Sequence, residues 1–179
     1  MAFARKILLG ILLLFIPMAA QAADSSLEYR VKAGFLFHFA MFVEWPATIL
    51  PPGAPLRIGL LAPPEVCSDI EQSLAGKSAA GHPLVTERVT TEALAKDAPH
   101  ILFVQRSADI SPSALAQILG DRPVLVVGET SGFASSGGAI GFVIRGDTLR
   151  FQVNLAAASH ANLQLSGQLA SLAEIVKAR

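Results

Sequence analysis

The chain has 179 residues, of which 52% are hydrophobic, and its 14 basic residues balance 14 acidic ones. This near-neutral balance, without basic runs, argues against nucleic acid as a partner. The length fits one domain with a full hydrophobic core.

The N-terminus has the pattern of a secretory signal peptide, which we place at residues 1–22. Two basic residues precede an apolar segment at residues 7–18, and the small residues Ala20 and Ala22 fit a cleavage site. We therefore expect an exported, periplasmic domain over residues 23–179. Loss of the two basic residues leaves a formal charge of 12 − 14 = −2. The alternative is an N-terminal membrane anchor, but the apolar segment is short for a span.

The segment KAGFLFHFAMFVEWP at residues 32–46 is too short to cross a membrane, which takes roughly 20 apolar residues, and we interpret residues 35–45 as a helix. An α-helix turns by about 100° per residue, which places the apolar residues on two faces. One continuous face is typical of a core and contains Phe35, Leu36, Phe39, Ala40, Phe42 and Val43. Phe37, Met41 and Trp45 fall at i, i+4 and i+8 on a second face, beside His38. This second face is either buried as well or a partner-binding surface, since aromatic and Met side chains are enriched at interfaces.

Strands and helices then alternate, which is typical of a parallel sheet. We expect strands at residues 56–62, 84–89, 100–104 and 123–129, and helices at residues 64–75, 91–95 and 112–119. Residues 139–144 and 149–153 flank a Gly-Asp turn and predict an antiparallel hairpin. A short helix at 155–161 and a last helix follow, the latter with a core stripe of Leu169, Leu172, Ala173 and Val176. The sequence thus predicts a single α/β domain with a mixed, mostly parallel sheet, flanking helices and a C-terminal antiparallel hairpin.

The Gly-rich segment GETSGFASSGG at residues 128–138 follows a buried strand and is the candidate ligand-binding loop. Ligands bind at the carboxyl ends of parallel strands, and here Gly132, Phe133, Gly137 and Gly138 would line such a crevice. The phosphate-binding patterns GxxxxGK[ST] and GxGxxG are missing, as is the GxSxG of serine hydrolases. Tight turns with positive φ are the simpler explanation of the glycines.

No metal site, cofactor or catalytic residue is predicted. No two of the four histidines have the spacing HxxH or HExxH, and the single cysteine offers no pair for zinc. Cys67 shares a helical stripe with Val66, Ile70 and Leu74, which predicts a buried, inert thiol. The alternative for Cys67 is a disulfide between two chains.

The segments KAGFLFHFAMFVEWP, HILFV, VLVVGETSGFASSGGAIGFV and LRFQVNLAAASHANL resemble, in this order, the YfiR-like family of bacterial periplasmic proteins. The resemblance covers roughly residues 28–176. It implies a soluble periplasmic α/β domain, often a homodimer, without catalytic activity. The best-understood members bind the periplasmic part of an inner-membrane diguanylate cyclase and repress it, which lowers cyclic di-GMP and biofilm formation.

The resemblance leaves a second function open and makes one feature doubtful. Other family members have no assigned function, so a periplasmic small-ligand-binding protein without a cyclase partner is the alternative. Redox-responsive members carry disulfide cysteines, and many relatives place a cysteine directly before the HILFV strand. Here Pro99 precedes that strand, so we do not expect an intrachain disulfide switch.

Overall fold

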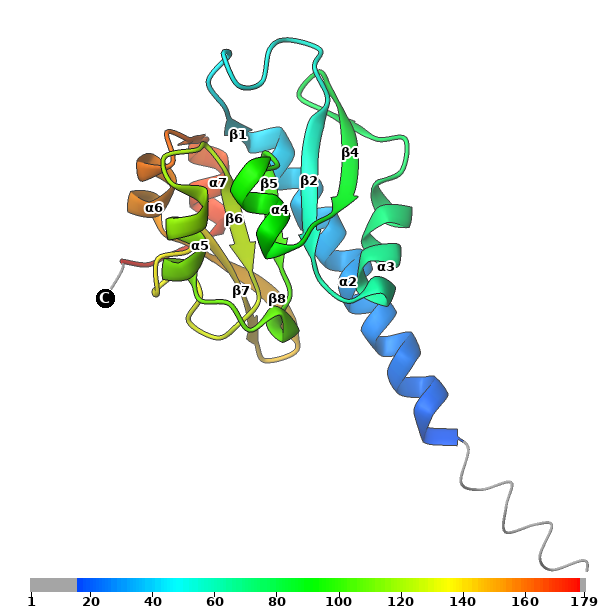
Figure 1. The fold of residues 1–179 in the computed structure, drawn as a ribbon. Helices are drawn as coiled ribbons and strands as arrows, with labels where there is room; N and C mark the ends of the chain where they lie inside the picture. Colours follow the sequence, from blue (N-terminus) through cyan, green and yellow to red (C-terminus); the bar gives the residue numbers. More distant parts are fainter. Residues whose placement is uncertain (1–15, 178–179) are drawn as a thin grey trace, which may run out of the picture.

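The computed structural model describes residues 16–177, and the side chains from Ser25 onward (Figure 1). Its helices are α2 (Ile16–Phe42), α3 (Pro64–Leu74), α4 (Thr91–Lys96), α5 (Pro112–Leu119), α6 (Leu155–His160) and α7 (Gly167–Leu172), with a short 3-10 helix η2 (Arg106–Ala108). Its strands are β1 (Val43–Glu44), β2 (Leu56–Leu61), β3 (Ser78–Ala79), β4 (His82–Arg88), β5 (Ile101–Val104), β6 (Leu125–Gly128), β7 (Ile140–Arg145), β8 (Thr148–Val153), β9 (Gln164–Leu165) and β10 (Glu174–Ile175).

Eight of these strands form one mixed sheet, in the order β10-β8-β7-β6-β5-β2-β4-β3. The neighbours from β4 to β7 pair in parallel, while β7 and β8 form an antiparallel hairpin from Ile140↔Val153 to Arg145↔Thr148. Gly146 occupies the hairpin turn with φ 58°. The predicted fold class, including the C-terminal hairpin, is therefore confirmed.

The chain reverses direction across the sheet between β2 and β5. From β2 the chain crosses through α3 to β4 on one side, then returns through α4 to β5 on the other side of β2. Such a switch point opens a crevice at the carboxyl ends of the strands, where ligands of parallel sheets usually bind. The topology thus predicts a functional site at the carboxyl ends of β2 and β5, with β6 beside them.

Hydrophobic side chains cover both faces of the sheet. In β5, Ile101 and Phe103 pack in the layer under α2 and α3, while Leu102 and Val104 pack in the layer under α4 and α5. Figure 1 shows α4 and α5 in front of the sheet and α2 behind it. α5 begins where its sequence predicts, because Ser111 caps the helix by accepting from the N–H of Ala114.

Most of the core face predicted for residues 35–43 is buried. Leu36, Phe39, Ala40 and Val43 are each at most 4% exposed. Phe35 and Phe42 are only partly buried and pack against the same core. The ring of Phe39 packs edge-on against Phe151 of the hairpin, with 5.3 Å between the centroids. α2 is therefore fixed against the hairpin of β7 and β8.

The predicted helix at residues 35–45 is wrong at both ends. The helix begins at Ile16 and ends at Phe42, because Val43 and Glu44 pair antiparallel with Leu165 and Gln164. Trp45 consequently lies beyond the helix and does not continue a face with Phe37 and Met41.

The last predicted helix is also wrong beyond its first turns. Ser166 caps it as expected, but α7 ends at Leu172, and Glu174 and Ile175 then pair in parallel with β8. Of the predicted stripe only Leu169 is buried, and Leu172 is 68% exposed. Edge pairing to β8 has overridden a local preference for helix.

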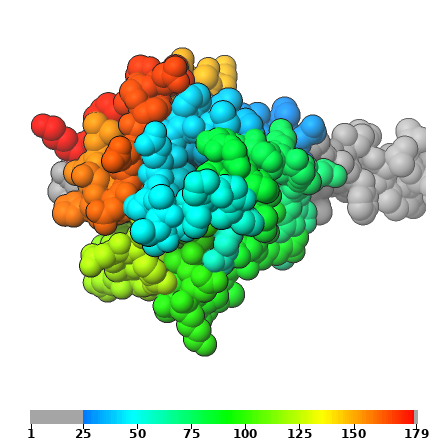
Figure 2. Space-filling model, turned by 90° about the horizontal axis from the view of Figure 1, so that it is seen from above, coloured from blue at the N-terminus to red at the C-terminus, as the bar shows by residue number. Residues whose placement is uncertain are grey.

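The connector between β1 and β2, residues 45–55, closes one end of the molecule. Figure 2 shows it in cyan between the orange-red C-terminal segment and green residues of the β4 to β5 region. Its Ala54 carbonyl lies 2.8 Å from Nδ1 of His82, and Trp45 packs edge-on against His100 with 6.2 Å between the ring centroids. Two of the four histidines therefore have structural contacts here.

The predicted signal peptide is not tested by the structure. Residues 1–15 lie outside the described residues, and residues 16–22 are described only as helical backbone of α2. Within the described part of the chain, no helix combines the length and the hydropathy of a membrane span.

Candidate functional site

A buried ion pair joins α2 to the carboxyl end of β6. Lys32 is 1% exposed, and its Nζ contacts the carboxylates of Glu28 and Glu129. Glu129 directly follows β6, and its side chain is also 1% exposed. Because loss of one partner would leave an uncompensated buried charge, this pair fixes α2 relative to the sheet.

A chain of hydrogen bonds extends this pair to β5. Tyr29 Oη donates to Glu129 Oε1 at 3.2 Å, and Gln105 Nε2 donates to Tyr29 Oη at 2.9 Å. Gln105 directly follows β5, next to the switch point. The network therefore lies where the topology predicts a functional site.

Arg106 covers the network on the solvent side. Its backbone N–H and its Nε both donate to Glu129 Oε1, at 3.2 and 3.1 Å. The Arg106 side chain is 60% exposed, in contrast to Lys32 and Glu129. We call these residues the carboxyl-edge cluster: Glu28, Tyr29, Lys32, Gln105, Arg106 and Glu129.

Electrostatics keep this cluster charged. Burial by itself would raise the pKa of the Glu129 carboxyl, but the hydrogen bonds and charges of Lys32 and Arg106 outweigh it and lower the pKa. Burial raises the pKa of the Tyr29 hydroxyl. Glu129 is thus a carboxylate and Tyr29 a neutral donor at neutral pH.

Two depressions flank Arg106, with volumes of about 350 and 520 Å³. Both are lined by Arg106, Thr130 and Ser131. The charged groups of the cluster are paired with one another. Among the described residues, no group of three or more His, Cys, Asp or Glu side chains is placed to hold a metal.

The Gly-rich loop is organised around a buried phenylalanine. Phe133 is 2% exposed, and a Cβ at Gly128 or at Gly138 would lie 2.4 or 2.3 Å from its ring. Glycine is therefore required at both positions for the ring to fit. Gly132 and Gly137 have φ values of 75° and 106°, which explains these two glycines by turn geometry.

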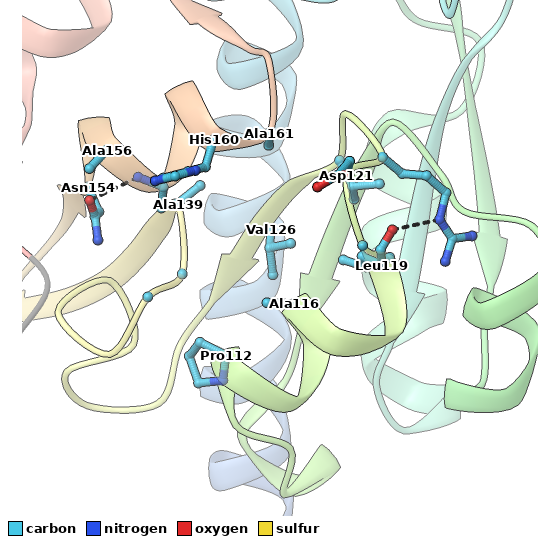
Figure 3. A pocket seen from close by; sticks show the side chains of 16 residues that line it. Pro112, Ala116, Leu119, Asp121, Val126, Ala139, Asn154, Ala156, His160 and Ala161 are labelled. Carbon is cyan, nitrogen blue, oxygen red and sulfur yellow. Dashed lines mark hydrogen bonds between the residues drawn. The ribbon is translucent and has the colours of Figure 1, made fainter.

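A cavity of about 410 Å³ lies between α5 and α6 (Figure 3). Gly137 and Gly138 line it, together with small side chains such as Ala116 and Ala157. Figure 3 shows Val126 of β6 between the two helices and His160 on the α6 side. The structure thus brings Gly137 and Gly138 to this cavity. Phe133 fills the core and borders the larger depression beside Arg106, and Gly132 lines neither space.

The three predicted partner-binding residues have different surroundings. Met41 is 41% exposed, and its sulfur accepts from the N–H of Ala80 at 3.2 Å. Phe37 is half-buried under Lys77, whose Nζ lies 5.4 Å from the ring centroid. Trp45 is half-buried in the connector. Their role in binding stays a proposal.

Cys67 is fully buried, and burial raises the pKa of its thiol. Its Sγ lies 3.4 Å from the carbonyl oxygen of Ala62. The predicted buried position is confirmed.

The carboxyl-edge cluster was not predicted from the sequence, although one of its residues carries a signal. Lys32 precedes Leu36 by four residues and so lies on the core stripe of α2. A charge on a core stripe indicates a buried ion pair. Its partner Glu129 stands 97 residues away, and the sequence gives no means of pairing the two.

The fold and the site define the chain as an α/β sheet domain whose charged groups at the carboxyl edge are paired internally. A family model described as YfiR/HmsC-like matches residues 29–174, and the chain belongs to this family. The match includes every member of the carboxyl-edge cluster except Glu28 and confirms the resemblance seen in the sequence.

Comparison with solved structures gives the same fold. A conserved domain protein of Vibrio cholerae O1 biovar El Tor is similar, with a TM-score of 0.52 and 14% identity over 73% of this chain. The chain spans 57% of the length of that structure. A search of the curated proteins found no match.

Proposed function

We propose that the protein is a non-catalytic periplasmic regulator that represses an inner-membrane diguanylate cyclase by contact with its periplasmic part. Membership of the YfiR/HmsC-like family over residues 29–174 carries this proposal. It is supported by the export pattern of residues 1–22 and by the internal pairing of the charges at the carboxyl edge.

The proposed contact surface contains Phe37, Met41 and Trp45. Met41 offers the most exposed apolar area of the three, since the other two are half-buried. Met and aromatic side chains adapt well to a partner and are enriched at interfaces. A partner that contacts Met41 would also meet the adjoining edges of Phe37.

The test is capture from the membrane. A photo-crosslinking residue in place of Met41 is expected to trap an inner-membrane diguanylate cyclase in cells. The same residue in place of Val85, which is 43% exposed on β4, serves as the matched control and traps none. Equal capture at both positions, or no membrane protein at Met41, contradicts the proposed contact.

A cellular measurement tests the regulatory role. Deletion of the gene is expected to raise cyclic di-GMP, and the wild-type protein restores the lower level. Met41→Glu is expected to fold normally because the side chain is exposed, yet to fail in this restoration. Unchanged cyclic di-GMP after deletion contradicts repression of a cyclase.

The cavity between α5 and α6 supports a second candidate, the binding of a small ligand. Its volume of about 410 Å³ falls in the range of small-molecule sites. Thermal-shift screening of periplasmic metabolites is expected to find a stabilising ligand. Ala116→Phe fills the cavity and abolishes the shift, whereas Gln117→Phe on the same helix keeps it. No stabilisation across a broad set contradicts this candidate.

A further inference from the structure

Three neighbouring parallel strands end at one edge of the sheet and bring two arginines together. β5, β6 and β7 pair in parallel, so their carboxyl ends share this edge. Arg106 lies two residues beyond β5, and Arg145 is the last residue of β7. Thr130 and Ser131 follow β6, the strand between those two. The topology therefore gathers two guanidiniums and two hydroxyls from segments that are distant in the sequence.

A step in the sheet leaves room beside the end of β7. β6 ends at Gly128, which pairs with Gly141, whereas β7 continues to Arg145. β7 thus extends about 13 Å beyond the end of β6, and Figure 1 shows the turn of the hairpin below the arrowhead of β6. The smaller depression, of about 350 Å³, lies at this step. It is lined by residues 143–145 of β7, by residues 129–131 and by Arg106.

The exposed charges in the lining of the smaller depression are both positive. The side chains of Arg106 and Arg145 are 60% and 54% exposed. Glu129 is the acidic residue of the lining, but its side chain is 1% exposed and contacts the buried Nζ of Lys32. An anion in the smaller depression therefore meets two guanidiniums and no exposed carboxylate of the lining.

A carboxylate holds each arginine on one side and leaves other N–H groups available. Arg106 Nε donates to Glu129 at 3.1 Å, and Arg145 donates from Nε and Nη2 to Glu174 at 3.0 and 2.7 Å. Nη2 of Arg106 lies 3.8 Å from Glu28, which is beyond hydrogen-bond distance. Among the described residues, neither terminal nitrogen of Arg106 and not Nη1 of Arg145 donates a hydrogen bond. Both guanidiniums are thus positioned before a ligand binds, which lowers the cost of binding.

The donors of the smaller depression fit a tetrahedral oxyanion. A guanidinium matches both carboxylate and phosphate, to which it donates two parallel hydrogen bonds. The exposed hydroxyls of Thr130 and Ser131 add donors from a third segment. A carboxylate has two acceptor oxygens in one plane, whereas a phosphate has oxygens that point in several directions. Donors from β7, from η2 and from the end of β6 therefore favour a phosphate group.

The larger depression, of about 520 Å³, has room for the organic part of such a ligand. It shares three lining residues, including Arg106, with the smaller depression. Ile110 and Pro112 give it apolar surface, and Asp109 and Ser136 can form hydrogen bonds with hydroxyl or amine groups. Its volume falls in the range of small-molecule sites.

We propose that the smaller depression binds the phosphate group of a small soluble phosphomonoester, whose organic part occupies the larger depression. Arg106 and Arg145 bind the phosphate oxygens, and the hydroxyls of Thr130 and Ser131 donate to them. The smaller depression shares no lining residue with the cavity between α5 and α6. The proposal goes beyond the regulatory function proposed above and does not depend on a cyclase partner.

Calorimetric titration with inorganic phosphate tests the smaller depression, at one fixed ionic strength because salt screens exposed charges. The purified wild type is expected to bind phosphate saturably at one site. Arg145→Gln is expected to fold normally, since the side chain is exposed, and to bind phosphate about tenfold more weakly or worse. Arg150→Gln removes the same charge from an exposed position of β8 outside the depression and should keep the affinity. Absent phosphate binding, or equal weakening by both variants, overturns the proposal.

A charge-conserving variant tests the role of the guanidinium of Arg106. Arg106→Lys keeps a positive charge beside Glu129 but loses the planar set of donors. It is expected to weaken phosphate binding about tenfold while the urea midpoint stays near that of the wild type. Unchanged phosphate affinity in Arg106→Lys overturns the assigned contact.

A comparison of anions tests the chemical class of the ligand. Glycerol 3-phosphate is expected to bind more tightly than inorganic phosphate, and acetate more weakly than both. Ser136→Phe, at an exposed position that lines only the larger depression of the two, should reduce the affinity for glycerol 3-phosphate to that for inorganic phosphate. Acetate that binds as tightly as phosphate, or a Ser136→Phe protein that keeps the preference for glycerol 3-phosphate, overturns the assignment.

Two further measurements separate this site from other sources of phosphate and from the cavity between α5 and α6. The protein is expected not to sediment with phosphatidylglycerol vesicles. Sedimentation that Arg145→Gln abolishes, without binding of the soluble phosphates, overturns the proposal in favour of a lipid headgroup. Ala116→Phe, which fills the cavity between α5 and α6, is expected to keep the phosphate affinity. Loss of phosphate binding in Ala116→Phe would place the phosphate in that cavity and overturn the proposed site.

Discussion

Two ion clusters hold this sheet, and they differ chiefly in burial. At the carboxyl edge, Lys32 and Glu129 each have side chains 1% exposed. On β2, Arg57 Nη2 lies 2.9 Å from Glu87 and 2.8 Å from Asp97, but these side chains are 30%, 28% and 72% exposed. Water and salt screen the second cluster, whereas the first has only its own partners to stabilise its charges. Similar groups therefore constrain the fold to different degrees.

The largest expected effect follows removal of the buried cation. Lys32→Met leaves Glu129 with a buried charge that Arg106 and Tyr29 compensate only in part. We expect a loss of about 3–5 kcal/mol in the free energy of unfolding, measured by urea denaturation. The double variant Lys32→Met/Glu129→Leu should recover most of the loss, because apolar replacement of both partners is often neutral. A loss below about 1 kcal/mol for Lys32→Met would show that the pair is solvated.

The second largest effect on stability is expected from acid, which protonates Glu129 of the buried cluster. The folded-state pKa of Glu129 is lowered, so its contribution to stability is complete above the ordinary carboxyl pKa of 4.5. That contribution is lost as the pH falls below 4.5 toward the folded-state pKa. Glu129→Gln should therefore flatten the dependence of unfolding free energy on pH between about pH 5 and pH 3.

The control for this titration lies in the exposed cluster. Arg57 lowers the pKa of Asp97 as well, chiefly through its hydrogen bonds. Because Asp97 is 72% exposed, Asp97→Asn should leave the pH dependence nearly unchanged. If both variants flatten the pH dependence of the unfolding free energy equally, the buried and exposed clusters do not differ in their contribution to acid stability.

A smaller effect is expected when the cation of the exposed cluster is removed. Arg57→Met leaves Glu87 and Asp97 free to be solvated. We expect a loss of about 0.2–1 kcal/mol in the free energy of unfolding, and a further decrease of this difference in high salt. The matched comparison is Lys32→Met in the same buffers, whose effect should persist in salt.

The smallest effect is expected from reductant. Cys67 is buried and free, so no intrachain disulfide contributes to stability. The urea midpoints with and without dithiothreitol should coincide. The ion pairs of the two clusters contain no sulfur, so reductant should not change their contribution to the free energy of unfolding. A clear decrease on reduction would reveal a disulfide between two chains, since a disulfide typically contributes about 2–4 kcal/mol.

Local signals in the sequence were enough to predict most of the elements. Ser111 and Pro112 define the start of α5, and the alternating residues of β7 and β8 define the hairpin. The errors arose where distant pairing overrides local preference. Val43 leaves the helix to pair with Leu165, and Glu174 leaves a helical pattern to pair with Gln152.

The candidate site was harder to predict for the same reason. The Gly-rich loop was visible as a motif, but its glycines mainly admit the ring of Phe133 or form turns. Lys32 carried a signal on the core stripe, whereas its pairing with Glu129 depends on the sheet topology that brings β6 to α2.

The position of α2 has a consequence for the order in which the protein folds. α2 precedes the strands of the main sheet along the chain, yet its Lys32 pairs with Glu129, 97 residues later. Phe39 packs against Phe151, and β1 pairs with β9, at still larger separations in the sequence. Contacts so distant in sequence form slowly and late. The apolar face of α2 therefore stays exposed until nearly the whole chain is available, and chaperones are expected to bind it during that interval.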